Sequence, residues 1–181
     1  NQMKSIIHER PGVYSSYGAS AAVWGGRAVR TIGVAAKSVS GTANTVIRLT
    51  SYEMGVSAFG EDAADAPGMS TMLKLLFQGG ASVVAAVKVD GEDYAAAFAA
   101  LQTVEDAQVI VCDSGALEVQ QALRASLESA SAIRRERIAV VGMDGASTTE
   151  LVERAKALNS ERMALVGPDG LDSAGKTLPG M

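Results

Sequence analysis

The most constraining feature of this chain is a regular alternation, from residue 31 onward, of short apolar runs with longer Ala-rich stretches at helical spacing. The runs are rich in β-branched residues and cover residues 31–36, 82–89, 108–113, 137–142 and 162–167. The helical candidates between them cover residues 67–78, 92–104, 116–131 and 147–159. Strands that alternate with helices form parallel sheets with right-handed crossovers. The sequence therefore predicts an α/β protein with an open, mostly parallel sheet flanked by helices.

Local patterns refine this expectation. Residues 138–141 are apolar at consecutive positions, which is expected where helices cover both faces of a parallel sheet. Ser147 and Glu150 have the spacing of a capping box at the start of the last helix. Residues 45–53 are a candidate for an edge strand or hairpin, with no definite register.

The first 27 residues differ from the rest because they are polar, small and interrupted by Pro11 and several glycines, which deny them a sustained helical period. We expect an extended N-terminal arm over residues 1–27, followed by one α/β domain over residues 28–181. An extended segment without a core of its own is suited to adding a strand to another sheet. An intramolecular edge strand and a frayed terminus remain open as alternatives.

Charge and composition exclude several classes of protein. The formal net charge is −4, and the one basic cluster, Arg134, Arg135 and Arg137, is interrupted by Glu136 and is interpreted as a solvated helix end. This balance argues against a nucleic-acid partner. No apolar run approaches the roughly 20 residues of a membrane span, so no membrane association is expected. With 48% hydrophobic residues the chain is predicted to be a soluble globular protein.

No catalytic or metal-binding constellation stands out. The single histidine, His8, lies in the arm, and the single cysteine, Cys112, lies inside a predicted strand, where a buried inert thiol is favoured. Asp113 and Ser114 follow that strand and are interpreted as caps of the next helix, and Asp144 is interpreted in the same way. We therefore predict a protein that is not an enzyme and needs no metal or cofactor.

One motif supports a rival interpretation. Residues 170–177, from Gly170 to Thr177, match the P-loop pattern of nucleotide-binding proteins. That mechanism requires a helix to begin at the Lys-Thr pair, yet Pro179 and Gly180 follow almost at once. A small nucleotide-binding α/β protein is kept as the alternative function, and an adaptor that binds a protein through the arm is a third.

Several short blocks follow one another along the chain: Arg10-Pro-Gly-Val-Tyr14, Phe59-Gly60, Leu75-Leu-Phe-Gln-Gly-Gly80 with the Val-rich run 82–89, Tyr94-Ala-Ala-Ala-Phe98-Ala-Ala-Leu101, and Gln108-Val-Ile-Val111. Their order resembles that in the tail sheath proteins of contractile phages, prophages and phage-tail-like bacteriocins. Two departures are clear. Residues 37–41 replace a Gly-Pro that often follows the first core strand of the family. The family's C-terminal portion, expected after a segment like 173–180, is missing, which suggests a piece of a longer protein.

The resemblance implies a structural subunit of a contractile tail sheath, which polymerises helically around an inner tail tube and contracts to drive injection. The implied partners are neighbouring sheath subunits, the inner tail tube protein and the baseplate. The implied location is a virion or phage-tail-like particle assembled in the cytoplasm of a bacterial host. The resemblance also assigns inter-subunit contacts to the arm, through Ile6, Ile7, Arg10, Pro11, Val13, Tyr14 and Tyr17.

Overall fold

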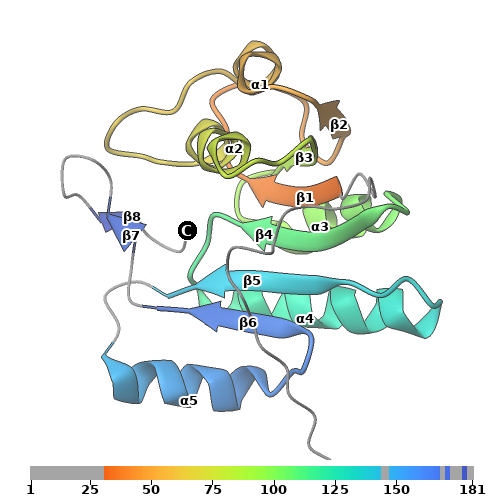
Figure 1. Ribbon diagram of the computed structural model, residues 1–181, viewed down its shortest axis with the longest axis vertical. Helices are drawn as coiled ribbons and strands as arrows, with labels where there is room; N and C mark the ends of the chain where they lie inside the picture. The colour runs from red at the N-terminus through yellow and green to blue at the C-terminus, as the bar shows by residue number, and fades with distance from the viewer. Residues whose placement is uncertain (1–30, 144–146, 168–169, 172–176, 179–181) are drawn as a thin grey trace, which may run out of the picture.

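The computed structural model describes residues 31–143, 147–167, 170–171 and 177–178 (Figure 1). The predicted fold class is confirmed: five helices flank a six-stranded, mostly parallel sheet. The sheet strands are β1 (Thr31–Ala36), β2 (Val46–Leu49), β3 (Val83–Lys88), β4 (Ala107–Cys112), β5 (Ile138–Gly142) and β6 (Met163–Val166). The helices are α1 (Tyr52–Phe59), α2 (Met69–Gln78), α3 (Tyr94–Gln102), α4 (Leu117–Ala132) and α5 (Thr148–Leu158).

The strand order is β2-β3-β1-β4-β5-β6. Strands β1, β3, β4, β5 and β6 run parallel, and β2 joins the β3 edge in the antiparallel direction. The chain moves outward from β1 to one side through β3 and then to the other side through β4. The carboxyl ends of β1 and β4 therefore form the topological switch point of the sheet, which is where open α/β sheets place their ligands.

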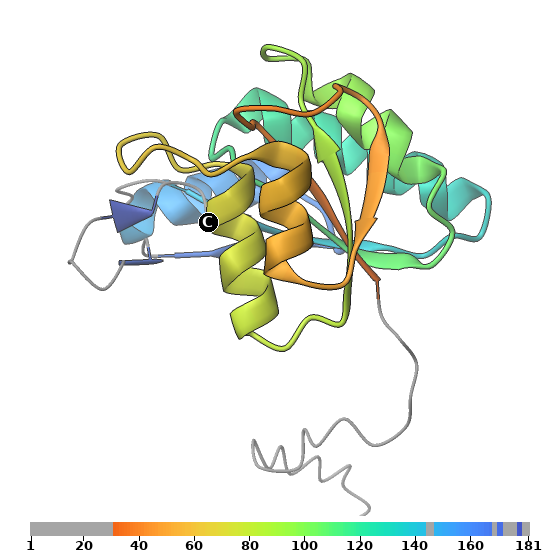
Figure 2. The same cartoon turned by 90° about the horizontal axis from the view of Figure 1, so that it is seen from above.

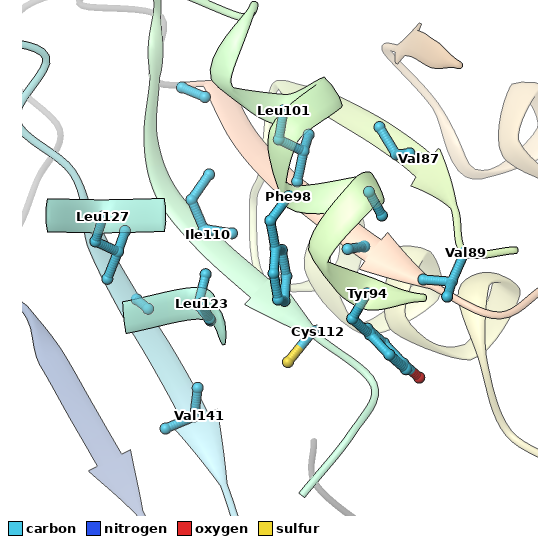
Figure 3. Close-up of a cluster of buried hydrophobic side chains, with 14 of the residues drawn as sticks. Val87, Val89, Tyr94, Phe98, Leu101, Ile110, Cys112, Leu123, Leu127 and Val141 are labelled. Atoms are coloured by element: carbon cyan, nitrogen blue, oxygen red, sulfur yellow. The ribbon is translucent and has the colours of Figure 1, made fainter. Parts of the chain in front are cut away.

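Two apolar clusters lie on opposite faces of the sheet. Figure 2 shows α1 and α2 on one side and α3 and α4 on the other. The cluster under α3 and α4 contains Phe98, Leu101, Leu123 and Leu127, and Figure 3 shows these side chains together with Ile110 and Cys112 of β4 and Val141 of β5. The cluster under α1 and α2 includes Phe59 and Leu73, both with no exposed area.

Small residues let the layers approach closely. Helix α3 contains five alanines around Phe98, and Gly33 of β1 lies beneath it. A Cβ atom on Gly33 would lie 2.6 Å from Ile110 Cδ1 and 3.3 Å from Leu101 Cδ2. The close packing of α3 on β1 therefore depends on the absence of a side chain at Gly33.

The predicted ends of two helices are confirmed. The Ser147 hydroxyl accepts a hydrogen bond from the Glu150 backbone N–H, and the Glu150 carboxylate accepts one from the Ser147 backbone N–H, which completes the capping box of α5. Helix α2 ends at Gln78 with Gly79 as its C-cap residue, and Gly80 follows with φ of +93°, a left-handed conformation that favours glycine.

Residues 45–53 contain both an expected and an unexpected element. Of the two predicted possibilities, an edge strand or a hairpin, the edge strand is present as β2, but the segment continues into α1, which the sequence pattern did not predict. Ser51 caps the start of α1, because its hydroxyl accepts a hydrogen bond from the Met54 backbone N–H. Eight residues give too few helical turns for a convincing period in the sequence.

The interpretation of the arginine cluster as a solvated helix end is wrong for Arg137. Its residue surface is only 4% exposed. Its guanidinium donates hydrogen bonds to the backbone carbonyl oxygens of Leu101, at 2.9 Å, and of Val104. The side chain thus caps the carboxyl end of α3, which a pattern of charges along the sequence does not indicate.

The expectation that helices cover both faces of the parallel sheet is correct for β1 and β3 and only partly correct for β4, where Val111 packs against the cluster under α1 and α2. On that side, no helix among the described residues lies over β5 and β6 (Figures 1 and 2). As a result Ile138 of β5 is 50% exposed and Val166 of β6 is 55% exposed.

Candidate functional site

The topological switch point contains a polar cleft of about 480 Å³. Its walls come from the loop after β1, the start of α3, the loop after β4 and helix α5. Four of its lining side chains belong to charged residue types: Lys37, Glu92, Asp113 and Arg154. This is the place where a ligand or a catalytic group would be sought first in such a sheet.

Asp113 is the central group of the cleft. One carboxylate oxygen accepts a hydrogen bond from the Tyr94 hydroxyl at 2.6 Å, and the other accepts one from the Lys37 backbone N–H at 2.9 Å. Burial raises the pKa of Asp113, while these two hydrogen bonds oppose that rise. Asp113 thereby ties together the end of β4, the end of β1 and the start of α3.

The interpretation of Asp113 and Ser114 as side-chain caps of the next helix is wrong. Helix α4 begins at Leu117, and its N-cap residue, Ala116, makes no side-chain capping hydrogen bond. The Asp113 carboxylate accepts its hydrogen bonds from Tyr94 of α3 and from Lys37, which follows β1. The Ser114 hydroxyl accepts a hydrogen bond from the backbone N–H of Ala116, at 3.3 Å, and not from a residue inside α4. The position of Asp113 directly after a strand did not show whether its carboxylate would cap the following helix α4 or bond to α3 and the end of β1. Asp144 lies outside the described residues.

The other charges of the cleft are also engaged. The Lys37 ammonium forms an ion pair with Glu92. Arg154 donates through Nη1 to the Gly115 carbonyl at 2.7 Å and to the Gln120 side-chain oxygen at 2.9 Å. The cationic and anionic groups therefore balance within the protein, and their contacts fasten loops and helices to one another.

The environment of the Cys112 thiol, next to the cleft, does not favour catalysis. Cys112 is buried, as predicted, and burial raises the pKa of its thiol to about 12, so the thiolate is scarce at neutral pH. The only histidine of the chain, His8, lies outside the described residues. Among the residues that the structure describes, no three His, Cys, Asp or Glu side chains are grouped to hold a metal ion.

The P-loop interpretation of residues 170–177 disagrees with the local structure. Strand β7 (Gly170–Leu171) pairs in the antiparallel direction with β8 (Thr177–Leu178), so that Gly170 faces Leu178 and Leu171 faces Thr177. A P-loop needs its threonine at the first turn of a helix. Thr177 lies in a strand instead, and Lys176 lies outside the described residues.

The two edges of the large sheet are formed by β2 and β6. Arg48 of β2 forms an ion pair with Asp106, which also accepts a hydrogen bond from the buried Thr31 hydroxyl at 2.5 Å. Strand β6, with the sequence Met-Ala-Leu-Val, carries no charged side chain. Edge strands present unpaired backbone groups that can accept a strand from another chain.

Beside the β6 edge lies an apolar groove of about 180 Å³, between α2 and the exposed faces of β4, β5 and β6. Met72, Leu75 and Leu76 form one wall of this groove, and Val111, Val140 and Val166 contribute the other. Leu75 is 43% exposed beside this groove.

All seven arm residues assigned to inter-subunit contacts lie outside the described residues, as does the whole of residues 1–27. Their role is therefore a prediction. None of the helices in the described part of the chain is both long and apolar enough to cross a membrane.

Comparison with known proteins gives matches only at the level of structure. No protein-family profile matches the chain, and no curated protein matches it either. The helical sheath of the anti-feeding prophage (AFP), solved by cryo-electron microscopy in its contracted state, matches with a TM-score of 0.57 and 16% sequence identity. A chain of the six-fold symmetrised AFP baseplate structure matches with a TM-score of 0.55 and 16% identity.

Each match covers 96% of this chain and 50% of the matched chain, so this chain spans about half the length of the solved structures. At this identity the likeness establishes the fold. The resemblance to contractile sheath proteins that the sequence indicated is thus confirmed as a resemblance of fold.

Proposed function

We propose that this chain is a structural subunit of a contractile injection system and, more specifically, part of a sheath subunit that polymerises helically around an inner tube. The observation that carries the proposal is the match of 96% of the chain to the AFP contracted sheath, reached independently of the sequence blocks that indicated the same family. The matched structures are assemblies, which supports protein partners rather than a small-molecule substrate.

The switch-point cleft is consistent with this role. In the proposed subunit the residues of the cleft hold the domain together, because Asp113 joins β1, β4 and α3 through two short hydrogen bonds. Arg154 similarly ties α5 to the loop before α4. A domain held in this way moves as a rigid body, and contraction is then a change between two packings of such bodies.

The arm supplies the connection between subunits. We propose that residues 4–17 add a strand to a neighbouring copy, with Ile6, Ile7, Val13 and Tyr14 as apolar anchors and main-chain hydrogen bonds as the bulk of the contact. Arg10, Pro11 and Tyr17 belong to the same proposed segment. A heterologous contact of this kind, repeated without closure, generates a helical filament. The proposed partners are neighbouring subunits, the inner tube protein and the baseplate, within a phage-tail-like particle assembled in a bacterial cytoplasm.

The baseplate match suggests a second candidate role within the same apparatus. Its TM-score is almost equal to that of the sheath match, so a ring-forming baseplate component has similar support from the fold. The two roles differ in the closure of the assembly. A sheath subunit forms tubes or stacked rings, whereas a baseplate component forms closed rings that do not stack.

Electron microscopy of the purified protein of 181 residues tests the proposal. We expect tubes or stacked rings, and we expect them to be lost when residues 1–17 are deleted. The matched control is the Tyr52→Phe change outside the arm, which should leave the assemblies intact. Single closed rings would favour the baseplate role. Persistent monomers at all concentrations and salt conditions would contradict both.

A further inference from the structure

In the apolar groove between α2 and strands β4 to β6, one face of the sheet is left without a covering layer among the described residues. Parallel strands whose residues are apolar at consecutive positions are normally covered on both faces. Here Ala139 and Val141 of β5 are buried under α4, but Ile138 is half exposed on the opposite face. On the same face, Val140 lies opposite Ala164 in the β5–β6 pairing, which continues the uncovered surface to the sheet edge. Something apolar is needed to cover it.

The residues that line the groove determine which kind of segment can bind in it. Every lining residue is apolar: Met72, Leu75, Leu76, Val111, Cys112, Val140, Val141, Gly142 and Val166. No charged side chain lines the groove, so a charged segment would lose its hydration there without gaining a partner. The occupant is therefore uncharged, rich in small or apolar side chains and able to place one large side chain in a space of about 180 Å³.

The segment before β1 fits this description. Residues 11–26 contain no charged side chain, and residues 19–24 read Ala-Ser-Ala-Ala-Val-Trp. Trp24 is the only tryptophan of the chain. Glycines flank this segment on both sides, at Gly18 and at Gly25-Gly26, so the backbone can turn where it enters and leaves.

The segment also lies within reach of the groove. Thr31 opens β1, and β4 is the next strand in the sheet, with Val111 of the groove paired to Val34. Val34 and Val111 belong to the cluster on the α1 and α2 side, which is the side of the groove. From Thr31 the groove is about 10 Å along the strand and about 5 Å across to β4. The seven residue-to-residue steps from Trp24 to Thr31 span up to about 23 Å.

We propose that residues 19–24 of this chain pack into the apolar groove of the same subunit, with the indole of Trp24 between α2 and β5. The packed segment completes the second layer over β4, β5 and β6. It also fixes the position from which the preceding residues 4–17 leave the domain. This inference stands apart from the proposed function, because it concerns the covering of a single subunit and holds whether or not subunits polymerise.

Tryptophan fluorescence tests the proposal directly, because the single indole reports on residue 24 alone. The measurement uses the full chain at low concentration, with emission wavelength and acrylamide quenching as readouts. We expect a blue-shifted emission that acrylamide quenches weakly. Leu75→Glu and Val166→Glu each place a charge in the groove at a partly exposed position, so the fold should persist while the emission shifts toward that of a solvent-exposed indole.

A matched control comes from α5, where Val152 is 47% exposed, close to the 43% of Leu75. Val152→Glu introduces the same charge on a helix outside the groove and should leave the emission unchanged. Far-ultraviolet circular dichroism verifies the fold of each variant. As a second measurement, Trp24→Ala should open the groove and increase the binding of an apolar fluorescent dye, and the dye should be lost again in the double variant with Leu75→Glu.

Three results would overturn the proposal. The first is a solvent-exposed emission in the unmodified chain. The second is a buried emission that neither groove variant changes, which would place Trp24 elsewhere. The third is a blue shift that appears only as protein concentration rises, which would mean that the groove takes the segment of a second copy.

Discussion

The buried guanidinium of Arg137 offers a quantitative test of how the domain is held together. Arg137 donates to the Leu101 carbonyl at 2.9 Å and to the Val104 carbonyl, and it lies 3.4 Å from the Gln102 carbonyl. These oxygens lie at or just beyond the carboxyl end of α3, where backbone acceptors have no intrahelical donor and a positive charge is favourable. Replacing Arg137 with methionine keeps an unbranched apolar stem and removes the donors.

The expected magnitude follows from two opposing contributions. Each hydrogen bond from a charged group contributes about 1.5–3 kcal/mol, so the two good bonds contribute about 3–6 kcal/mol before costs. Burial disfavours the charge and lowers the pKa of Arg137, and its Nε has no partner among the described residues, a cost of about 1–3 kcal/mol. We therefore expect Arg137→Met to lower the free energy of unfolding by about 2 kcal/mol, which is a fall in Tm of about 4–8 °C.

Urea unfolding followed by circular dichroism, together with thermal melts, measures this loss. Arg137→Lys should fall between the wild type and the methionine variant, because one ammonium cannot reach both carbonyl oxygens in the same geometry. The control is Arg134→Met at an exposed neighbouring position, which should change stability by less than about 0.5 kcal/mol. If Arg137→Met is as stable as the wild type or more stable, desolvation outweighs the hydrogen bonds and the reasoning is refuted.

Three further predictions concern other contacts. The Arg48 and Thr31 hydrogen bonds lower the pKa of Asp106 from 3.8 to about 2, so Asp106→Asn should cost up to about 1 kcal/mol near pH 7, and the difference should vanish in urea titrations as pH falls from about 4 to about 2. Gly33→Ala places a methyl group against Ile110 and should lower the free energy of unfolding by about 1–3 kcal/mol in the same assay. Because burial raises the pKa of Cys112 to about 12, a thiol reagent should label the protein only at the rate of unfolding, and fast labelling of the native protein would contradict this.

The candidate site shows where sequence reasoning reached its limit. The sequence placed Asp113 correctly at the end of a strand, but its partners, Tyr94 and the Lys37 backbone N–H, lie 19 and 76 positions away. A cap of the following helix is the contact that a local pattern suggests, since the helix is the nearest element along the chain. The order of strands decided the outcome, because it places the ends of β1 and β4 side by side.

Local sequence patterns also predicted the strands that border the apolar groove but not the groove itself. Apolar runs indicated strands near 137–142 and 162–167 and implied that both of their faces are covered. They could not show that the two helices of one face lie over β1 and β3 and leave Val140 and Val166 to another occupant. Which half of a sheet a helix covers depends on the crossover that precedes it, and this is a property of the assembled topology.

By itself the sequence determined the fold class, the five parallel strands, the four longer helices and the capping box at Ser147, because hydrophobic period and capping chemistry act over a few neighbouring residues. Only the tertiary structure decided the strand order, the antiparallel direction of β2, the burial of Arg137 and the free face beside Val166. These features depend on pairings between residues far apart in the chain, whose energies no local pattern contains.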